Sequence, residues 1–201
     1  MKTALITVGS TREYIDPVRY ITNESSGQQG MALIKSLIKN NFKVICIHGY
    51  LQVKPVISNK ISYIFTPNAE RMLKAAKKNK NVDLAIFNAA VADYRVENYQ
   101  KQKIKKNKNL TLKFRNNPDI LKTISNISSG PQITVGFAYE TNDVKANALK
   151  KLKKKNCDYL VLNYPISKNN IFNNMYNNGG VFNKKGHYHE IGNVTKTSFA
   201  N

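Results

Sequence analysis

Residues 4–9 read ALITVG, and residues 16–30 read DPVRYITNESSGQQG. The first segment is a short apolar run without polar alternation, which is typical of a strand covered on both faces. The second segment is polar, and its last glycine opens a run, residues 30–39, in which the apolar side chains follow helical spacing. A buried strand, a long polar connection and a helix are the first unit of an alternating α/β chain.

The alternation of strand and helix continues through most of the chain. Asn68 is placed to cap a second helix, and residues 141–155 form the last one. Between them, Asn117-Pro118-Asp119 begins a short helix with proline in its first turn. This order predicts an α/β fold, built as a Rossmann-like, doubly wound, mostly parallel sheet. The further strand-like runs cover residues 43–48, 61–66, 82–88, 110–114, 133–138 and 158–163.

Two segments interrupt this pattern. Residues 96–109 are polar and rich in lysine, and we expect them to form a flap. Residues 169–183 are dominated by Asn and Gly, which favours a hairpin or loop inside a small C-terminal β extension over about residues 164–195. The last residues show no clear closing helix. We expect a single domain over residues 1–201.

The chain has 201 residues with 32 basic and 12 acidic side chains, so its net charge is +20. This charge favours an anionic partner, either a phosphate-rich small ligand or nucleic acid. Abundant Lys, Asn and Ile also fit a simple compositional bias. The aromatic residues do not interleave with lysines as they do in nucleic-acid-binding sheets, so we expect no nucleic-acid partner.

The sequence also bears on compartment and redox state. No apolar run approaches the length of a membrane span, and Met1-Lys2-Thr3 leads directly into the first strand. We therefore expect a cytoplasmic protein without a membrane partner. Cys46 and Cys157 lie in or beside predicted strands without CxxC spacing, which is typical of buried, reduced cysteines.

A first strand followed by glycines invites comparison with dinucleotide-binding folds. Their fingerprint needs GxGxxG in the first turn and an acidic residue at the end of the second strand. Here the first turn, GSTRE at residues 9–13, has one glycine, and the second strand ends in His48-Gly49. Gly27 and Gly30 instead open a helix whose N–H groups and dipole suit a phosphate, although an ordinary glycine-capped helix has the same pattern.

Other polar clusters follow strands or lie on adjoining helices. In open α/β folds the carboxyl ends of the strands meet at one edge, where ligands bind, so these clusters are expected to converge there. Small side chains at Ala89 and Ala90 would let a flat ligand approach the backbone. The clusters read NAAVADYR (88–95), KIKK (103–106), NNPDIL (116–121) and GFAYET (136–141).

Together with DPVRYITN-x-SSG at residues 16–27, these clusters resemble phosphopantothenoylcysteine synthetase in order and spacing, from about residue 4 to residue 196. The resemblance implies a ligase of coenzyme A biosynthesis. Such enzymes activate the carboxylate of 4′-phosphopantothenate with CTP in bacteria, or ATP in animals, and release pyrophosphate. The amine of L-cysteine then attacks the acyl-cytidylate, giving 4′-phosphopantothenoylcysteine and CMP.

The resemblance also implies cofactors and partners. Mg²⁺ is expected with the nucleotide phosphates, and no flavin is expected on this chain. The protein is expected to be a homodimer through its C-terminal β extension and to work with a separate phosphopantothenoylcysteine decarboxylase. Two other functions stay open as alternatives, an NAD(P)-binding reductase and a basic nucleic-acid-binding protein.

Carried over residue by residue, the resemblance makes Asn23, Lys103 and Arg19 the expected catalytic residues. Asn23 would contact the activated acyl group, or else form an Asx-turn before the helix. Arg19 would contact a carboxylate or phosphate, or else form an ion pair with Asp16. Lys103 would close over the triphosphate. Asp93 is the expected carboxylate for Mg²⁺ among the phosphate oxygens.

The binding residues implied by the resemblance form two sets. Asn163 is expected to reach the pantothenate moiety across a dimer interface, and Ala89 and Phe137 either frame the base or pack in the core. The substrate set is Asn23, Ser25, Gly27, Gly30 and Asn163. The nucleotide set is Ala89, Ala90, Asp93, Lys103, Asn117, Pro118, Phe137, Lys151 and Lys155.

One departure from the family bears on the phosphate. The family commonly has a lysine where this chain has Gln28. A neutral amide donates hydrogen bonds but brings no positive charge. On this pattern alone, the substrate phosphate is expected to be bound more weakly.

Overall fold

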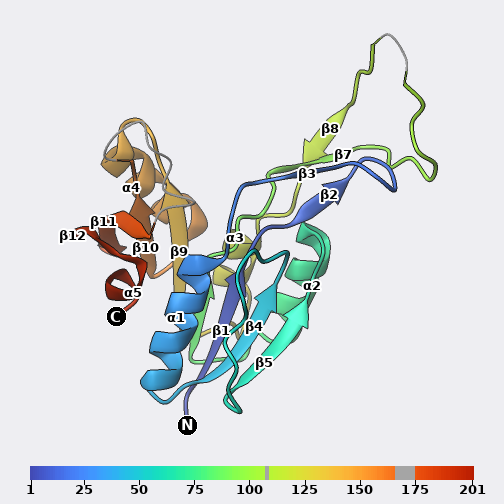
Figure 1. Ribbon diagram of the computed structural model, residues 1–201. Helices are drawn as coiled ribbons and strands as arrows, with labels where there is room; N and C mark the ends of the chain where they lie inside the picture. Colours follow the sequence, from blue (N-terminus) through green and yellow to red (C-terminus); the bar gives the residue numbers. More distant parts are fainter. Residues whose placement is uncertain (107–108, 166–174) are drawn as a thin grey trace.

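A mostly parallel sheet forms the centre of the molecule (Figure 1). The structure, a computed structural model, describes residues 1–106, 109–165 and 175–201. Its strands follow the order β12-β11-β10-β9-β6-β1-β4-β5. The strands β10, β9, β6, β1, β4 and β5 run parallel to one another, and β11 and β12 add an antiparallel hairpin. The prediction of a Rossmann-like, mostly parallel sheet is therefore confirmed. The bounds are β1 Thr3–Val8, β4 Lys43–His48, β5 Ile61–Phe65, β6 Leu84–Phe87, β9 Ile133–Tyr139, β10 Tyr159–Asn163, β11 Tyr176–Asn183 and β12 Tyr188–Thr195.

The strand β1 shows why its sequence lacks polar alternation. Leu5 packs into the core on one face of the sheet, whereas Ala4, Ile6 and Val8 pack into the core on the other face. Each of these four side chains is at most 1% exposed. A strand covered on both faces gains from apolar residues at every position, and this explains the continuous apolar run.

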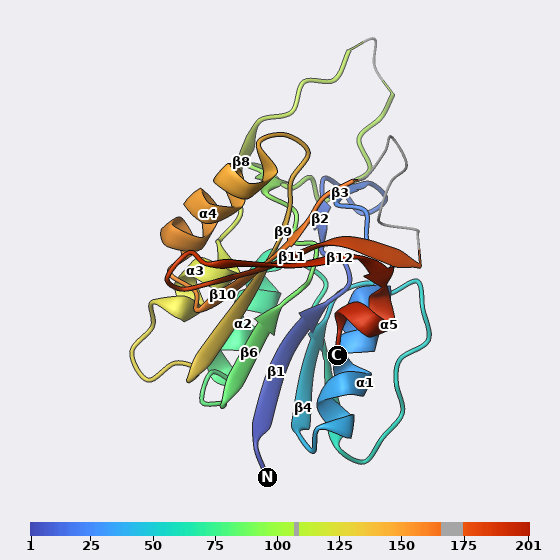
Figure 2. The same cartoon turned by 90° about the vertical axis from the view of Figure 1, so that its left-hand side faces the viewer.

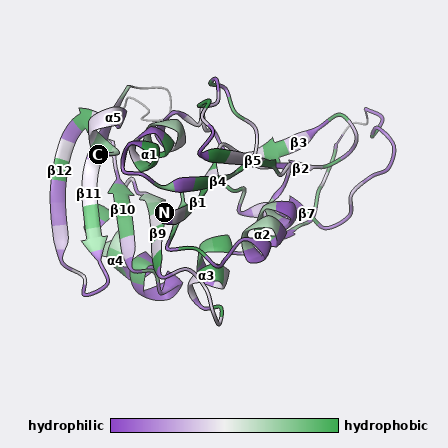
Figure 3. Ribbon diagram, turned by 90° about the horizontal axis from the view of Figure 1, so that it is seen from below, coloured by the Kyte–Doolittle hydropathy of each residue, from purple (hydrophilic) through white to green (hydrophobic). Residues whose placement is uncertain are grey.

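Helices cover both faces of the sheet (Figures 2 and 3). The helices α1 (Gln28–Lys39) and α5 (Lys196–Phe199) lie on one face. The helices α2 (Ala69–Lys78), α3 (Ile120–Ser125) and α4 (Val144–Lys155) lie on the other. This arrangement of two helical layers around one sheet is the doubly wound architecture expected from the alternating pattern.

The caps of two helices test the predicted starts. Asn68 caps α2, as predicted, by accepting a hydrogen bond from the Arg71 N–H at 3.0 Å. The cap of α3 is Asp119, which accepts from the Lys122 N–H at 3.0 Å. The prediction of Pro118 in the first turn of this helix is therefore wrong. Aspartate is the better cap because its side-chain oxygen reaches the free N–H groups of the first turn.

The predicted strand over residues 110–114 is also wrong. Its last residue, Phe114, begins β8 (Phe114–Asn116), which pairs with β7 (Tyr94–Val96) outside the central sheet. Leu110 and Phe114 are 55% and 46% exposed, so no core is available to bury this apolar run. The segment belongs to a long extension between β7 and β8, which projects from one end of the molecule (Figure 1).

This extension contains the predicted flap. The structure describes its residues 97–113 apart from 107–108. The hairpin of β2 (Arg12–Tyr14) and β3 (Tyr20–Thr22) lies beside the base of the extension, where the Gln100 N–H donates to the Ile15 carbonyl at 3.0 Å. The extension thus begins at the edge of the sheet at which the strand β1 ends.

The C-terminal region forms a hairpin and a short helix. The prediction for residues 169–183 was a hairpin or loop, and the described part of this range forms the single strand β11, which pairs with β12 in an antiparallel hairpin that extends beyond it. Residues 166–174 lie outside the described residues. The expectation of no closing helix is wrong, because α5 is capped by Thr195, whose Oγ1 accepts from the Ser198 N–H at 3.1 Å. A helix of four residues is too short to show a periodic pattern.

The predicted state of the cysteines is confirmed. Cys46 and Cys157 are both free and buried. Burial raises the pKa of the Cys46 thiol to about 12, so this group stays protonated and behaves as a small apolar side chain. Among the described residues, no helix is both long and apolar enough to cross a membrane.

Candidate active site

A cavity of about 610 Å³, called here the first cavity, lies at the carboxyl ends of β6, β9 and β10. The segment between β3 and α1 forms one wall, and the turn after β6 forms another. Parallel strands with helices on both faces leave such a crevice at this edge. The lining residues are 22–29, 88–91, 137–139, Asp93, Lys151, Asn163, Asn177 and Lys196.

A second cavity of about 540 Å³ adjoins the first. The two cavities have five lining residues in common, so one wall separates two spaces of similar size. These five residues are Ala89, Val91, Asp93, Phe137 and Lys151. The rest of the second cavity is lined by Thr7, Phe87, Ala92, Tyr94, residues 116–121, Lys154 and Lys155.

Two glycines place the N-terminus of α1 at the first cavity. Gly27 lines the cavity and has a φ of +83°, a conformation that glycine adopts without the strain that a side chain brings. Gly30 lies one turn further along the helix, and a Cβ built on it would lie 2.3 Å from Val8 Cγ1. Gly30 therefore serves close packing of α1 on β1, and the structure does not place it at the wall of either cavity.

The predicted substrate residue Asn23 joins two walls of the first cavity. Its Nδ2 donates to the Val91 carbonyl at 3.1 Å, which ties the segment before α1 to the turn after β6. Ser25 and Asn163 line the same cavity, and Asn163 Oδ1 is buried with no hydrogen-bond partner among the described residues. The four predicted substrate residues Asn23, Ser25, Gly27 and Asn163 thus line the same cavity within a single chain.

Hydrogen bonds to two threonine hydroxyls fix the backbone of the turn after β6. The Thr7 hydroxyl accepts from the Ala89 N–H at 3.2 Å, and the Thr11 hydroxyl accepts from the Ala92 N–H at 3.0 Å. Asn117 extends this support, because its Nδ2 donates to the Ala92 carbonyl at 2.7 Å. Small residues at positions 89 and 90 keep the backbone of this turn open to the cavities, and Pro118 lines the second cavity.

Lysines of α4 bring positive charge to the second cavity. Lys151 Nζ lies 3.1 Å from Glu140 Oε1, and Lys155 forms an ion pair with Asp119. As predicted, both lysines lie on one face of α4, where the carboxylates hold them in place at the cavity wall. The exposed Asp93 is the carboxylate on the wall between the two cavities.

The structure does not bring Arg19 and Lys103 to either cavity. Arg19 donates through Nε and Nη2 to Asp16 Oδ2, at 3.0 and 2.5 Å, so the ion pair left open by the sequence is present. Arg19 Nη2 also donates to the Ile104 carbonyl at 2.7 Å. Lys103 is the neighbour of Ile104 on the extension, and both Arg19 and Lys103 line a separate cavity there.

The carboxyl of Asp16 is buried and strongly stabilised as the anion. Burial alone would raise its pKa, but hydrogen bonds from Arg19 and from the backbone N–H groups of Val18, Arg19 and Ile104 outweigh burial and hold the pKa well below its usual range. The interaction joins the turn between β2 and β3 to the extension that carries Lys103.

The described residues also bear on metal binding. No three His, Cys, Asp or Glu side chains come together as a metal site in residues 1–106, 109–165 and 175–201. Asp93 alone offers a carboxylate at the shared wall, which is the kind of ligand that Mg²⁺ takes when phosphate oxygens supply the remaining ligands. Asp93 therefore fits a metal that arrives with a nucleotide.

The residues of the first cavity that were not anticipated from the sequence include Gln29, Asn177 and Lys196. Gln29 Oε1 accepts a hydrogen bond from Asn177 Nδ2 at 2.8 Å, and Lys196 Nζ lies 3.4 Å from Gln28 Oε1. Asn177 and Lys196 lie on the C-terminal hairpin and on α5, which are far from the other site residues in sequence. An Asn-rich run and a four-residue helix carry no local signal that marks these two positions.

A family model and curated relatives match most or all of this chain. The DNA/pantothenate metabolism flavoprotein C-terminal domain family matches residues 1–201. The coenzyme A biosynthesis bifunctional protein CoaBC of Vibrio vulnificus (strain YJ016) is 41% identical over 167 residues, which cover 81% of this chain and 41% of that protein. CoaBC of Haemophilus influenzae is 40% identical over 185 residues, covering 90% of this chain and 45% of that protein. The chain thus spans less than half the length of these curated relatives.

A solved structure agrees in fold over nearly the whole chain. The crystal structure of the C-terminal domain of a coenzyme A biosynthesis bifunctional protein CoaBC has a TM-score of 0.81 and 32% sequence identity. The match covers 99% of this chain and 90% of that one. The α/β fold of the chain is therefore that of this domain.

Proposed function

Because the chain belongs to the DNA/pantothenate metabolism flavoprotein C-terminal domain family, we propose that it is a phosphopantothenate–cysteine ligase of coenzyme A biosynthesis. The observation that supports this proposal best is the pair of adjoining cavities with a shared wall. A ligase that activates an acid with a nucleotide needs two reactants side by side, so that an intermolecular step takes place within one complex.

We assign 4′-phosphopantothenate to the first cavity and CTP to the second. The N-terminus of α1 suits the phosphate of the substrate, and Asn23 lies near the shared wall, where the carboxylate would react. In the second cavity, Asn117 and Pro118 face the nucleotide, and Lys151 and Lys155 face its phosphates. The shared residues, Asp93 among them, then lie between the two reacting groups.

The reaction proceeds in two steps. An oxygen of the substrate carboxylate attacks the α-phosphorus of CTP, the bond from that phosphorus to its bridging oxygen breaks, and pyrophosphate leaves. The cysteine amine then attacks the acyl carbon of the cytidylate, the bond to the CMP oxygen breaks, and the amine gives up a proton. The chain's own task is to bring a carboxylate and a triphosphate together against their repulsion, for which the lysines of α4 supply positive charge.

Asn23 supports the charge that develops on the acyl group. An amide donates a hydrogen bond without adding a charge, and a fixed donor stabilises an oxyanion without reorganising during the reaction. Mg²⁺, held by Asp93 and the nucleotide phosphates, would neutralise the phosphate oxygens when bound. The reaction involves no oxidation or reduction, and we therefore assign no flavin to it.

The remaining assignments follow the family resemblance. CTP rather than ATP, a homodimer, and a phosphopantothenoylcysteine decarboxylase as the next enzyme are parts of the same proposal. Of the two alternatives, the NAD(P)-binding reductase lacks support at the end of β4. There His48 packs against Tyr63 and Phe65, with ring centroids 5.7 and 5.6 Å away, where such enzymes have an acidic residue for the ribose.

The test is pyrophosphate release by the purified protein supplied with 4′-phosphopantothenate and L-cysteine, with CTP and ATP in parallel reactions. We expect release that requires 4′-phosphopantothenate and is faster with CTP. A reaction without 4′-phosphopantothenate measures background hydrolysis of the nucleotide. Absence of release with both nucleotides would contradict the ligase assignment, and faster release with ATP would contradict the choice of CTP alone.

A further inference from the structure

We propose that Lys196 of α5 supplies the positive charge that binds the substrate phosphate at the N-terminus of α1. This proposal rests on the proposed function, because it concerns the phosphate of the same substrate. It makes the C-terminal hairpin and α5 part of the substrate site. The ligand class is a phosphate monoester that carries about two negative charges.

The N-terminus of α1 needs a cation from elsewhere in the chain. The helix begins after Gly27 with no side-chain cap, and its first turn holds no acidic residue. Its first N–H groups and its dipole favour an anion. However, no lysine or arginine occurs in the sequence between Arg19 and Lys35, so neither the segment before α1 nor its first turn can balance the charge of a phosphate.

Lys196 is the cation that the fold brings to this place. It lines the first cavity, its residue is 8% exposed, and its Nζ lies 3.4 Å from Oε1 of Gln28, the first residue of α1. Burial lowers the pKa of its ammonium group, because a charge is less stable away from water. A bound anion would offset this cost.

Among the described residues, three other charged side chains line the first cavity. Glu24 and Asp93 are acidic, and Lys151 is the second cation. Lys151 pairs with Glu140 and also lines the second cavity, so it belongs to the nucleotide side. Within the part of the chain that the structure describes, Lys196 is therefore the lysine beside α1 in the first cavity.

An independent observation at Gln29 also points to an anion. Gln29 is 9% exposed and lines the cavity, and its Oε1 accepts from Asn177 Nδ2 at 2.8 Å. This bond fixes the amide so that Nε2 remains a donor, and Nε2 has no hydrogen-bond partner among the described residues. A buried donor without an acceptor is costly, and a phosphate oxygen would satisfy it.

These groups bring several donors together, beside the acceptors Gln28 Oε1 and Ser26 Oγ, each of which lies 3.4 Å from one of them. The N–H groups at the start of α1, Gln29 Nε2 and Lys196 Nζ come from α1 and α5, which pack against each other (Figure 2). An anion with several acceptor oxygens fits such a set, and a lysine acts on it as a point charge. The absence of a lysine at position 28 is thus balanced by a lysine from the end of the chain.

The test compares the binding of 4′-phosphopantothenate with that of pantothenate, which lacks the phosphate, by isothermal titration calorimetry. We expect Lys196→Met to weaken 4′-phosphopantothenate binding by about tenfold or more, because a charged hydrogen bond is lost, and to leave pantothenate binding unchanged. Lys196→Arg should retain most of the affinity. The matched control is Lys185→Met, which removes an exposed lysine of the same hairpin.

A second variant tests the charge itself. Because Gln28 and Lys196 are neighbours, Gln28→Lys in the Lys196→Met background should restore much of the affinity for 4′-phosphopantothenate. Inorganic phosphate should compete with 4′-phosphopantothenate in the unmodified protein, and competition that is equally strong in Lys196→Met would overturn the assignment. Circular dichroism verifies that each variant is folded, and Lys196→Gln replaces Lys196→Met if the latter does not fold.

Two outcomes separate the failure of this inference from the failure of the proposed function. If the unmodified protein releases pyrophosphate but Lys196→Met and Lys196→Gln bind 4′-phosphopantothenate as tightly as it does, the Lys196 assignment is wrong and the ligase assignment stands. If the unmodified protein neither binds 4′-phosphopantothenate nor releases pyrophosphate, both are wrong.

Discussion

In the proposed function, one side chain, Asn23, serves both structure and chemistry. Its hydrogen bond to the Val91 carbonyl fixes the segment before α1 against the turn after β6, and it leaves the amide at the wall of the first cavity. An Asx-turn was the alternative interpretation from the sequence, and the bond to Val91 spans 68 positions instead. Local sequence does not reveal a partner this distant.

The first prediction concerns this residue. Asn23→Asp replaces an amide donor with a negative charge beside a developing oxyanion, and we expect kcat to fall by about 100-fold, equivalent to about 3 kcal/mol. The measurement is the steady-state rate of pyrophosphate release. Asn81→Asp, an exposed change of the same kind, should behave as the unmodified protein. Normal turnover by Asn23→Asp would remove this residue from the reaction.

Asp16 is the residue on which the position of Lys103 depends. Its carboxylate accepts from the Ile104 N–H at 3.1 Å while Arg19 donates to the Ile104 carbonyl, so the extension is held by both backbone polar groups of one residue. The sequence left Arg19 with two partners, a substrate anion or Asp16. The structure shows the second, because a buried carboxylate without a cation would be too costly.

The second prediction is a pH dependence of stability. The pKa of Asp16 is lower in the folded protein than its ordinary value of 3.8, so the carboxylate stabilises the fold above about pH 4, and this contribution is lost as the pH falls through the folded pKa. Asp16→Asn should therefore unfold at lower urea concentration at pH 7, and the difference should narrow at pH 3. Glu97→Gln, an exposed neutralisation on the extension, is the control. A difference of equal size at both pH values would exclude ionisation of Asp16 as its source.

At the scale of elements, long helices and strands with buried side chains were predictable from the sequence, whereas short or exposed segments were not. The helix α1 buries one apolar face, so its sequence carries the helical period, whereas β1 is buried on both faces and its sequence is a continuous apolar run. Residues 110–114 have the composition of a strand but no sheet or core to pack against, and α5 has only four residues. In both cases the structure depends on what the rest of the fold places beside the segment.

The third prediction concerns the packing of α1 on β1. Gly30→Ala places a methyl group 2.3 Å from a buried valine in a strand, which forces the two elements apart. Overpacking costs about 1–3 kcal/mol, whereas alanine gains at most about 1 kcal/mol in helix propensity over glycine. We expect a net loss in the free energy of unfolding, measured by urea denaturation.

A double mutant isolates the cause. Val8→Ala removes the two methyl groups nearest to the added one, so Gly30→Ala should cost less in that background than in the unmodified protein. Equal cost in both backgrounds would show that the helix does not depend on this contact. The same movement of α1 would displace the cavity wall, so the affinity for 4′-phosphopantothenate should fall together with stability.

At the scale of the whole molecule, the sequence predicted the edge of the sheet at which the two cavities lie, but only part of their lining. The residues that follow β6 and the lysines of α4 were identifiable, because they lie in clusters at the carboxyl ends of strands or on an adjoining helix. Asn177 and Lys196 were not, because they reach the cavity only through the packing of the C-terminal hairpin and α5 onto the body of the sheet. A single sequence does not show which distant segments meet.

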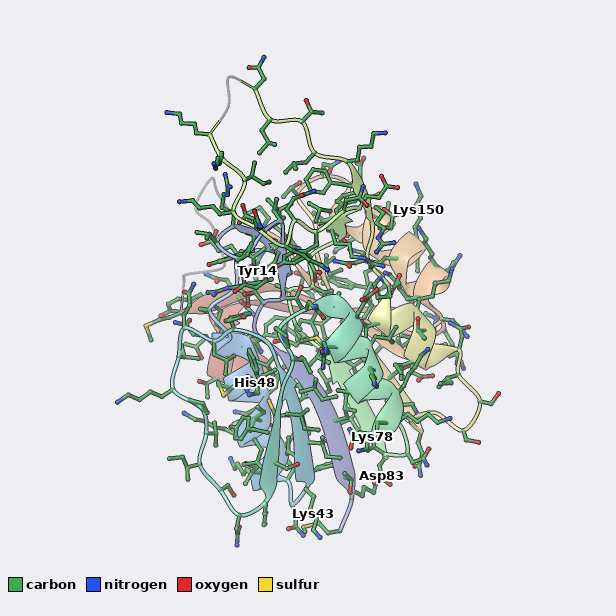
Figure 4. All side chains as sticks on the ribbon, turned by 90° about the vertical axis from the view of Figure 1, so that its right-hand side faces the viewer. Tyr14, Lys43, His48, Lys78, Asp83 and Lys150 are labelled. Atoms are coloured by element: carbon green, nitrogen blue, oxygen red, sulfur yellow. The ribbon has the colours of Figure 1, made fainter. Side chains whose placement is uncertain are left out.

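Net charge is the other property of the whole molecule. The net charge is +20, and three of the lysines, Lys43, Lys78 and Lys150, lie at separate places around the fold (Figure 4). A field of this kind attracts anions generally and does not identify one. The cavities supply the selectivity, and the field raises the rate at which anionic reactants reach them.

The last prediction follows from this field. Raising the salt concentration from about 0.1 M to about 1 M shortens the screening length from about 10 Å to about 3 Å, so the KM for CTP should rise by about threefold to tenfold. L-cysteine is a zwitterion without net charge near pH 7, and its KM should change little, which makes it the control within the same enzyme. Initial rates of pyrophosphate release at varied CTP and at varied L-cysteine give both values. If the two KM values rose in parallel, salt would be perturbing the fold or the chemical step, and attraction of the nucleotide by the net charge would not be the explanation.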